Sequence, residues 1–168
     1  SVRLAREEQR VVAFLEPIAL YPMRDLHAAK DGGWMQRYPD PSQTIALGEV
    51  GQHGAGQELA IVTFGHGTYL SQQALPAIEA SGIKTRIIDM RWLSPLPKDA
   101  LTKAVAGCEN ILVVDETRHS GGVAEALMAH FHAVSEANLA RLTPGDSFIA
   151  TGPAPAATLP SIEHLPHR

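Results

Sequence analysis

Three strand-like runs with apolar centres, each followed by a turn and a segment with helical periodicity, constrain the fold of this 168-residue chain most strongly. The runs cover residues 59–64, 85–90 and 111–114, and a shorter strand-like segment follows at 139–142. Strands without polar alternation are buried on both faces, and strands that alternate with helices are typical of a parallel sheet covered on both sides. We therefore predict an α/β protein: a three-layer α/β/α sandwich with a mostly parallel sheet of about five strands.

The segments between these runs predict three helices, over residues 68–81, 98–106 and 123–134. Each has apolar side chains at intervals of three and four residues, which is typical of a helix packed on a core. Pro76 lies inside the first helix, and we expect it to kink this helix or to split it in two. Residues 44–47 predict an additional edge strand, and a short helical turn is expected near residues 161–165.

A further apolar run, at residues 11–15, has no other strand-like run near it in the sequence. We therefore expect residues 1–21 to be the tail of an upstream domain and residues 22–37, rich in Pro, Gly and Asp, to be a linker. Residues 38–168 then form the α/β domain. The alternative is that residues 11–15 form an edge strand of that same domain.

Composition excludes several classes of protein. The single cysteine, Cys108, excludes an internal disulfide framework and a cysteine-built zinc site, and with no basic neighbour in the sequence its thiol is expected to be inert. The net charge of -4 offers no basic surface for nucleic acid. No apolar run approaches the ~20 residues of a membrane span, and no signal-peptide pattern is present. We expect a soluble, cytoplasmic protein that binds neither nucleic acid nor membranes.

The polar residues of interest follow the predicted strands, where ligands of open α/β sheets gather. They are Gly65, His66, Gly67, Asp89, Arg91, Asp115, Glu116, Arg118, His119, Gly121 and Gly122. Gly65, Gly67 and Asp89 resemble a dinucleotide-binding pattern, but Leu70 replaces its third glycine. We therefore favour a tight turn at Gly65–Gly67 and keep nucleotide binding as the alternative.

The densest polar cluster joins Asp115 and Glu116 to Arg118 and His119. Paired acids at a strand end suit acid–base chemistry or a cation, and the N–H groups behind Gly121-Gly122 suit an anion or a neighbouring subunit's carboxylate. We favour loop structure or a contact with another subunit over a catalytic or ligand-binding role for this cluster.

Histidines are numerous in the chain but do not follow a metal-binding spacing. His130 and His132 are two residues apart on a predicted helix, so their side chains point in different directions and cannot chelate as a pair. His66 and His119 follow different strands and could converge. We predict no metal site.

Several segments match, in order, one family of enzymes. Residues 14–21 carry the pattern Phe-x-Glu-x-x-x-x-Tyr, and further matches cover residues 45–49, 60–65, 87–97, 113–116 and 121–125. Together they resemble the beta subunit of thiamine diphosphate-dependent 2-oxo acid dehydrogenases, a member of the transketolase C-terminal domain family. The resemblance covers nearly the whole chain and implies a flavodoxin-like C-terminal domain preceded by the last strand of a pyrimidine-binding domain.

The resemblance implies the reaction, cofactors and partners that are known for this family. Such enzymes decarboxylate a 2-oxo acid with thiamine diphosphate and Mg²⁺ and transfer the acyl group to a lipoyl carrier. Their partners are an alpha subunit, a second beta subunit and a lipoyl acyltransferase core. The family's catalytic residues lie upstream of the Phe14–Tyr21 pattern, so no residue here, Glu16 included, inherits a catalytic, cofactor-binding or metal-binding role.

We therefore expect a C-terminal fragment that acts as an assembly and docking domain, binds no cofactor and is inactive alone. Two alternatives remain open. One is a fragment of a transketolase-type transferase, since these enzymes share the domain. The other is a stand-alone flavodoxin-like domain that binds a small ligand or a nucleotide.

Overall fold

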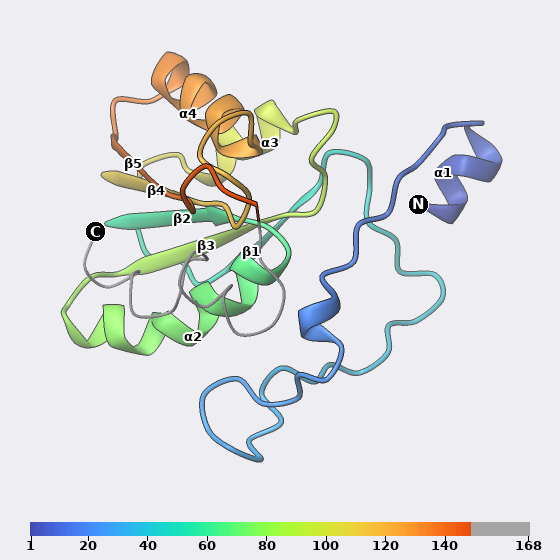
Figure 1. Cartoon of the computed structure of the whole chain (residues 1–168), viewed down its shortest axis with the longest axis horizontal. Coiled ribbons are helices and arrows are strands. Elements are labelled where there is room, and N and C mark those ends of the chain that lie inside the picture. The colour runs from blue at the N-terminus through green and yellow to red at the C-terminus, as the bar shows by residue number, and fades with distance from the viewer. Residues whose placement is uncertain (149–168) are drawn as a thin grey trace.

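A five-stranded sheet between two helical layers forms the body of the molecule in the computed structural model, which describes residues 1–148 (Figure 1). The strands are β1 (Val50–His53), β2 (Leu59–Thr63), β3 (Thr85–Met90), β4 (Asn110–Val114) and β5 (Asn138–Leu142). Their order in the sheet is β1-β3-β2-β4-β5, and all pairs are parallel except β1 with β3. The predicted three-layer sandwich with about five mostly parallel strands is confirmed.

The helices cover opposite faces of this sheet (Figure 1). Helix α2 (His66–Ala80) lies on one face, and α3 (Lys98–Ala104) and α4 (Val123–Val134) lie on the other. The core between the sheet and α2 consists of Ile61, Ala74, Ile78, Ile87, Leu112, Val114 and Leu142. The core between the sheet and helices α3 and α4 includes Val62, Ile88, Leu101, Ile111, Leu127 and Phe131. Adjacent strand residues point to opposite faces, so each continuous apolar run contributes to both cores.

Two local expectations are wrong. Residues 44–47 form no strand, because side chains hold them in a turn: the Trp92 indole donates to the Ala46 carbonyl, and the Glu49 carboxylate accepts the Ala46 N–H. The edge strand is β1, a few residues later. The split expected at Pro76 is also wrong, because α2 continues through this residue, which is exposed between the buried Ala74 and Ile78. The turn expected near residues 161–165 lies outside the described residues.

The N-terminal segment runs outside the sandwich (Figure 1). It contains the short helix α1 (Val2–Glu7) and the 3-10 turn η1 (Ile18–Leu20). Residues 11–15 have no regular secondary structure, pair with no described strand and leave Phe14 70% exposed, so the alternative that they form an edge strand of the α/β domain is wrong. We call residues 11–21 the arm. The division of the chain into domains stays a prediction.

An ordered loop occupies much of the segment expected to be a linker. The Asp31 carboxylate accepts four backbone N–H groups, from Leu26, His27, Ala28 and Gly33, at 2.7–2.9 Å. The Asp25 carboxylate accepts two more, from Lys30 and Gly32. Carboxylates at the start and end of the loop thus satisfy its backbone donors, which fixes the shape of the loop without regular secondary structure.

These bonds make the loop sensitive to acid. The four N–H donors hold the pKa of Asp31 well below its ordinary value of 3.8. Since the folded pKa is the lower one, the carboxylate stabilises the folded loop above about pH 4, and this contribution is lost as pH falls through the folded pKa. We expect a carbon-detected NMR titration to place the Asp31 midpoint clearly below that of the same residue in the urea-unfolded chain. Equal midpoints would contradict the hydrogen bonding described.

Candidate functional site

The carboxyl edge of the sheet has a point where the connections diverge. Strands β2 and β4 are neighbours, but β2 leads into α2 on one face and β4 leads towards α4 on the other. Ligands of open α/β sheets bind in the crevice at such a switch point. The side chains gathered there by these two connections therefore form the candidate functional site of this domain.

His66 and Glu116 meet at this point. His66 is the first residue of α2 and Glu116 follows β4, and the distance from His66 Nδ1 to Glu116 Oε2 is 3.3 Å. The imidazole also stacks on Tyr69 with ring centroids 6.0 Å apart. Gly65, at φ 56°, takes the left-handed conformation that lets the chain turn from β2 into α2. A carboxylate can orient an imidazole for proton transfer, and both side chains are partly exposed.

Asp115 has a structural task. Its side chain is completely buried, one carboxylate oxygen accepts the Thr117 N–H at 2.8 Å, and the other accepts the Ala124 N–H at 2.9 Å. Ala124 lies in the first turn of α4, where backbone N–H groups lack partners within the helix. Asp115 therefore holds the loop after β4 and the beginning of α4 together, which is the loop role that we favoured.

The dinucleotide-like pattern is used for packing. A Cβ added at Gly67 would lie 2.1 Å from Thr63 Oγ1, so the small residue lets α2 approach β2 closely. The Asp89 carboxylate accepts a hydrogen bond from the Thr68 hydroxyl at 3.1 Å. Asp89, which would hold a ribose in the nucleotide-binding alternative, is thus tied to the first turn of α2. These contacts support the tight-turn interpretation over nucleotide binding.

The chain itself supplies a carboxylate beside Gly121-Gly122, where an anion was one of the roles not favoured. The N–H of Gly121, the residue before the N-cap of α4, donates to the Glu125 carboxylate at 3.1 Å. Nearby, the Asp146 carboxylate accepts hydrogen bonds from the Ser120 hydroxyl and backbone N–H, which lower the pKa of Asp146, and the charges of His119 and Arg118 lower it further.

The histidines do not converge. His66 faces Glu116, whereas the His119 ring contacts Thr143 and Arg141. On the other side of the molecule, His130 bonds the Thr102 hydroxyl and joins α4 to α3. Within residues 1–148, no three His, Cys, Asp or Glu side chains gather closely enough to hold a metal ion.

Thiamine diphosphate with Mg²⁺, which the resemblance implies for the full enzyme, does not fit the described residues. Its metal needs several oxygen ligands, but both oxygens of Asp115 already accept backbone N–H groups and Asp89 is bonded to Thr68. We derive no step through this cofactor for the part of the chain that the structure describes.

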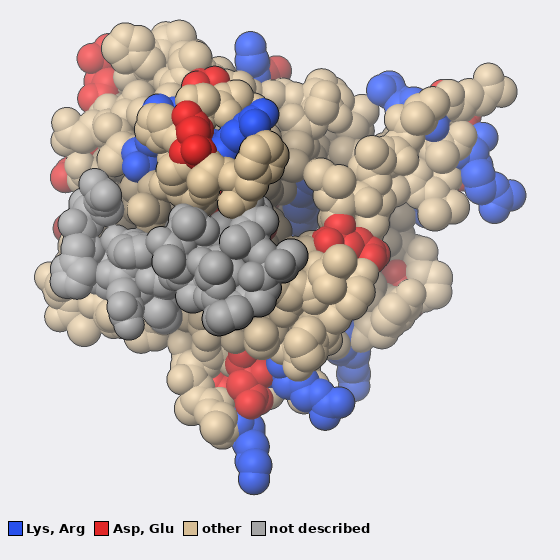
Figure 2. Space-filling model, in the orientation of Figure 1, with Lys and Arg blue, Asp and Glu red and all other residues tan. Residues whose placement is uncertain are grey.

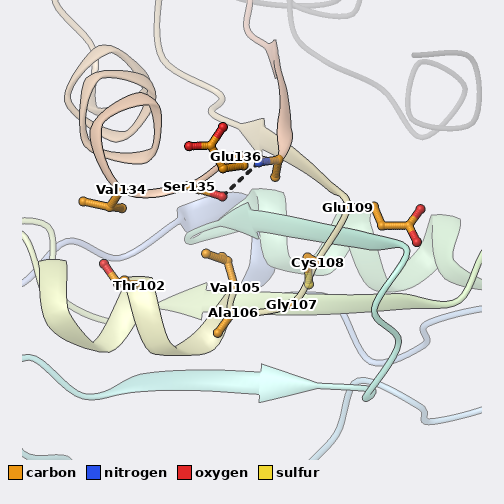
Figure 3. A pocket seen from close by; sticks show the side chains of 10 residues that line it. Thr102, Val105, Ala106, Gly107, Cys108, Glu109, Val134, Ser135 and Glu136 are labelled. Atoms are coloured by element: carbon orange, nitrogen blue, oxygen red, sulfur yellow. Dashed lines mark hydrogen bonds between the residues drawn. The ribbon is translucent and has the colours of Figure 1, made fainter.

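A shallow groove of about 410 Å³ lies at the opposite, amino edge of the sheet (Figure 3). It is lined by the ends of α3 and α4 and by the segments that lead into β4 and β5, and the buried Cys108 belongs to it. Burial raises the pKa of the Cys108 thiol, while the charge of Arg86 opposes this rise. The expectation of no basic neighbour is therefore wrong, because Arg86 comes from β3, but burial still dominates and keeps the thiol protonated.

Charged side chains are interspersed on the face shown in Figure 2, where Lys and Arg lie among Asp and Glu without forming one continuous basic patch. Arg91, another residue of the carboxyl edge, pairs with Glu49 at 2.8 Å. Among the described helices, none has the length and hydropathy needed to cross a membrane.

The sequence interpretation missed Tyr69 and the loop that packs against it. The Tyr69 hydroxyl donates to the Asp25 carbonyl at 2.9 Å, and the Trp34 ring meets the Tyr69 ring edge-on at 5.0 Å. The available signal was the pair of aspartates, Asp25 and Asp31, with Gly32-Gly33 after the second, a composition typical of tight side-chain-capped turns.

Fold and site together define a small α/β domain whose carboxyl-edge acids chiefly support its own loops. The chain belongs to the family of transketolase C-terminal domains, whose family model, described as "Transketolase, C-terminal domain", matches residues 48–164. The resemblance inferred from the sequence motifs is thereby confirmed.

Relatives with known names include beta subunits of oxidoreductases. The chain is 27% identical over 154 residues to the "Pyruvate dehydrogenase E1 component subunit beta" of Bacillus subtilis (strain 168), covering 89% of this chain and 44% of that protein. It is also 27% identical over 127 residues to the "Acetoin:2,6-dichlorophenolindophenol oxidoreductase subunit beta" of Cupriavidus necator, covering 76% and 37%. The chain thus spans less than half the length of these relatives.

A solved structure shows the same fold. It is described as "Split gene transketolase, inactive beta4 tetramer" and matches with a TM-score of 0.59 at 21% identity, covering 67% of this chain and 38% of that chain.

Proposed function

We propose that this chain supplies the C-terminal domain of the decarboxylating component of a 2-oxo acid dehydrogenase complex, where it holds subunits together and performs no chemistry itself. Family membership and the named beta-subunit relatives support this role. In the complete cytoplasmic enzyme, thiamine diphosphate and Mg²⁺ would be bound by other parts of the assembly. The partners would be an alpha subunit, a second beta subunit and a lipoyl acyltransferase core.

The exposed apolar arm is the observation that carries this proposal. Five of its large side chains are at least 66% exposed: Val11, Phe14, Leu15, Ile18 and Tyr21. Each such side chain stabilises an interface by about 1.5–3 kcal/mol when it becomes buried. A contiguous group of them outside the core is typical of a surface that another domain or subunit covers.

The carboxyl edge supports the same interpretation. Asp115 and Asp89, the acids best placed for chemistry, are engaged by backbone and hydroxyl donors of the domain itself. Of the acids that follow β3 and β4, Glu116 remains partly exposed and pairs with His66. An edge built in this way serves to order loops, which suits an assembly domain.

The assembly role predicts concentration-dependent self-association through the arm. In sedimentation velocity, we expect the chain to exceed its monomer mass of 18.0 kDa at high concentration. The triple variant Phe14→Ser, Leu15→Ser and Ile18→Ser should weaken this association by at least about tenfold, because it removes apolar area from the interface.

Val134→Ser is the matched control, since Val134 is 46% exposed but lies on α4, outside the arm. It should leave self-association unchanged. A chain that stays monomeric at all concentrations would contradict the proposal. So would thiamine diphosphate-dependent decarboxylation of pyruvate or a branched-chain 2-oxo acid by the chain alone.

A further inference from the structure

We propose that residues 25–34 form a clamp that fixes the arm to helix α2, so that the apolar side chains of the arm are presented in one defined position. The segment otherwise resembles a linker in composition, being rich in Gly and Asp. In the structure it is a closed loop packed against α2, and the chain enters it directly from the arm (Figure 1).

The clamp is rigid by itself. Six backbone N–H groups of the loop donate to the carboxylates of Asp25 and Asp31. The Trp34 N–H donates to the Arg24 carbonyl at 3.0 Å, which closes the two ends of the loop on each other. Charge-assisted bonds of this kind are about twice as strong as neutral ones, so they hold the loop in one shape as it packs on α2.

Three contacts tie the clamp to α2. Tyr69, which is 7% exposed, donates its hydroxyl hydrogen to the Asp25 carbonyl. One turn later the Gln73 amide donates to the Leu26 carbonyl at 2.9 Å and lies 3.0 Å from the Tyr69 hydroxyl. The Trp34 ring packs edge-on against the Tyr69 ring at an angle of 81°. Two of these contacts are to backbone carbonyls, so they position the main chain of the clamp itself.

Consecutive turns transmit this position to the arm. The Met23 N–H donates to the Leu20 carbonyl, and the Tyr21 N–H donates to the Ile18 carbonyl. The Tyr21 hydroxyl also donates to the Glu16 carboxylate. Hydrogen-bonded backbone therefore continues from the clamp to η1, and the apolar side chains there have a fixed direction. An arm ordered in advance loses less conformational freedom when a partner covers it, which favours binding.

Distance measurements between two spin labels test the clamp. One label replaces Ile18, which is 75% exposed in η1, and the other replaces the exposed Glu79 near the end of α2. Cys108→Ala removes the native thiol, and dilution with unlabelled protein suppresses distances between molecules. We expect one narrow distance distribution in this parent and a clearly broader one after Asp31→Ala or Gln73→Ala.

Gln72→Ala is the matched control, because Gln72 precedes Gln73 on the same helix but makes no hydrogen bond to the clamp among the described residues. It should leave the distribution narrow. A broad distribution in the parent, or equal distributions in the Gln73→Ala and Gln72→Ala proteins, would overturn the proposal.

Limited trypsin digestion provides a second readout that does not need labels. Asp31→Ala should raise cleavage after Arg24, at the beginning of the clamp, by about tenfold relative to cleavage after Arg10, which precedes the arm; the residue that follows Arg24 is the same in both proteins. Circular dichroism should show that the sheet remains folded, since the clamp lies outside both cores. An unchanged ratio of the two cleavage rates in a folded Asp31→Ala protein would also overturn the proposal.

Discussion

Asp115→Ala is expected to lower the free energy of unfolding by about 3–5 kcal/mol, the largest effect of any single substitution considered for this chain. The wild-type carboxylate is completely buried and accepts two backbone N–H groups, one from Thr117 and one from Ala124. Hydrogen bonds to charged groups contribute about 1.5–3 kcal/mol each, and alanine leaves the buried Ala124 N–H without a partner and removes the acceptor of the partly buried Thr117 N–H. Because small domains have only about 5–15 kcal/mol of stability, urea unfolding should show a much lower midpoint.

Asp146→Ala separates this effect from the general loss of an aspartate. Asp146 also accepts two hydrogen bonds at the same edge of the sheet, both from Ser120, but its side chain is exposed. Water can replace the lost acceptor there, so we expect a much smaller change in the unfolding midpoint than for Asp115→Ala. Similar losses of unfolding free energy in the two variants would contradict the conclusion that the burial of Asp115 makes its hydrogen bonds important for stability. Asp115→Asn, which keeps one acceptor oxygen, should fall between wild type and Asp115→Ala.

The body of the fold could be predicted because its signals are local. Residues 59–63, 85–90 and 110–114 are apolar on both faces, and both faces are in fact covered by helices. The helix at Val123–Val134 was predicted with its observed bounds, since its apolar stripe and preceding glycines are contained in one short stretch of sequence. The spacing of apolar residues indicates which faces of a helix or strand are buried, and in this sandwich the buried faces follow that spacing.

The edge and the arm could not be predicted in the same way. The apolar run at residues 11–15 and the segment 44–47 both have strand-like composition, but a strand also needs a neighbour with free backbone groups. The backbone of Ala46 is instead held by two side chains. Trp92 is distant in the sequence, and Glu49 is near but bonds through its carboxylate and not through a strand ladder. The loop from Asp25 to Trp34 depends on contacts with Tyr69 and Gln73, more than 30 residues away, so composition alone suggested a linker.

The candidate site shows the same distinction. Asp115 and Glu116 are adjacent in sequence and were considered together, yet one is buried under the beginning of α4 and the other pairs with His66 at the surface. Successive residues after a strand point to different sides of the sheet edge, and sequence does not reveal which neighbour each will meet. The loop-supporting role of Asp115 therefore follows from its hydrogen bonds to Thr117 and Ala124, which only the structure reveals.

Gly67→Ala should destabilise the protein by about 2 kcal/mol, although helix propensity alone would favour alanine by about 1 kcal/mol. The new Cβ would lie 2.1 Å from Thr63 Oγ1, inside the closely packed contact between α2 and β2. Thr63 is completely buried and β-branched, so it cannot move aside without an unfavourable rotamer or a shift of the helix. The overpacking cost therefore exceeds the gain in propensity.

Thr63→Ala provides the rescue that identifies this mechanism. Thr63 Oγ1 has no hydrogen-bond partner among the described residues, so its removal costs mainly packing, and the methyl group introduced by Gly67→Ala can occupy the freed space. In a double-mutant cycle measured by urea unfolding, we expect Gly67→Ala to be nearly neutral or stabilising in the Thr63→Ala background, a coupling of about 2 kcal/mol. Ser71→Ala removes another buried, unpartnered hydroxyl from α2 but does not touch the Gly67 position, and it should not rescue. Additive free energies with Thr63→Ala would contradict the assignment of this cost to the close contact between Gly67 and Thr63.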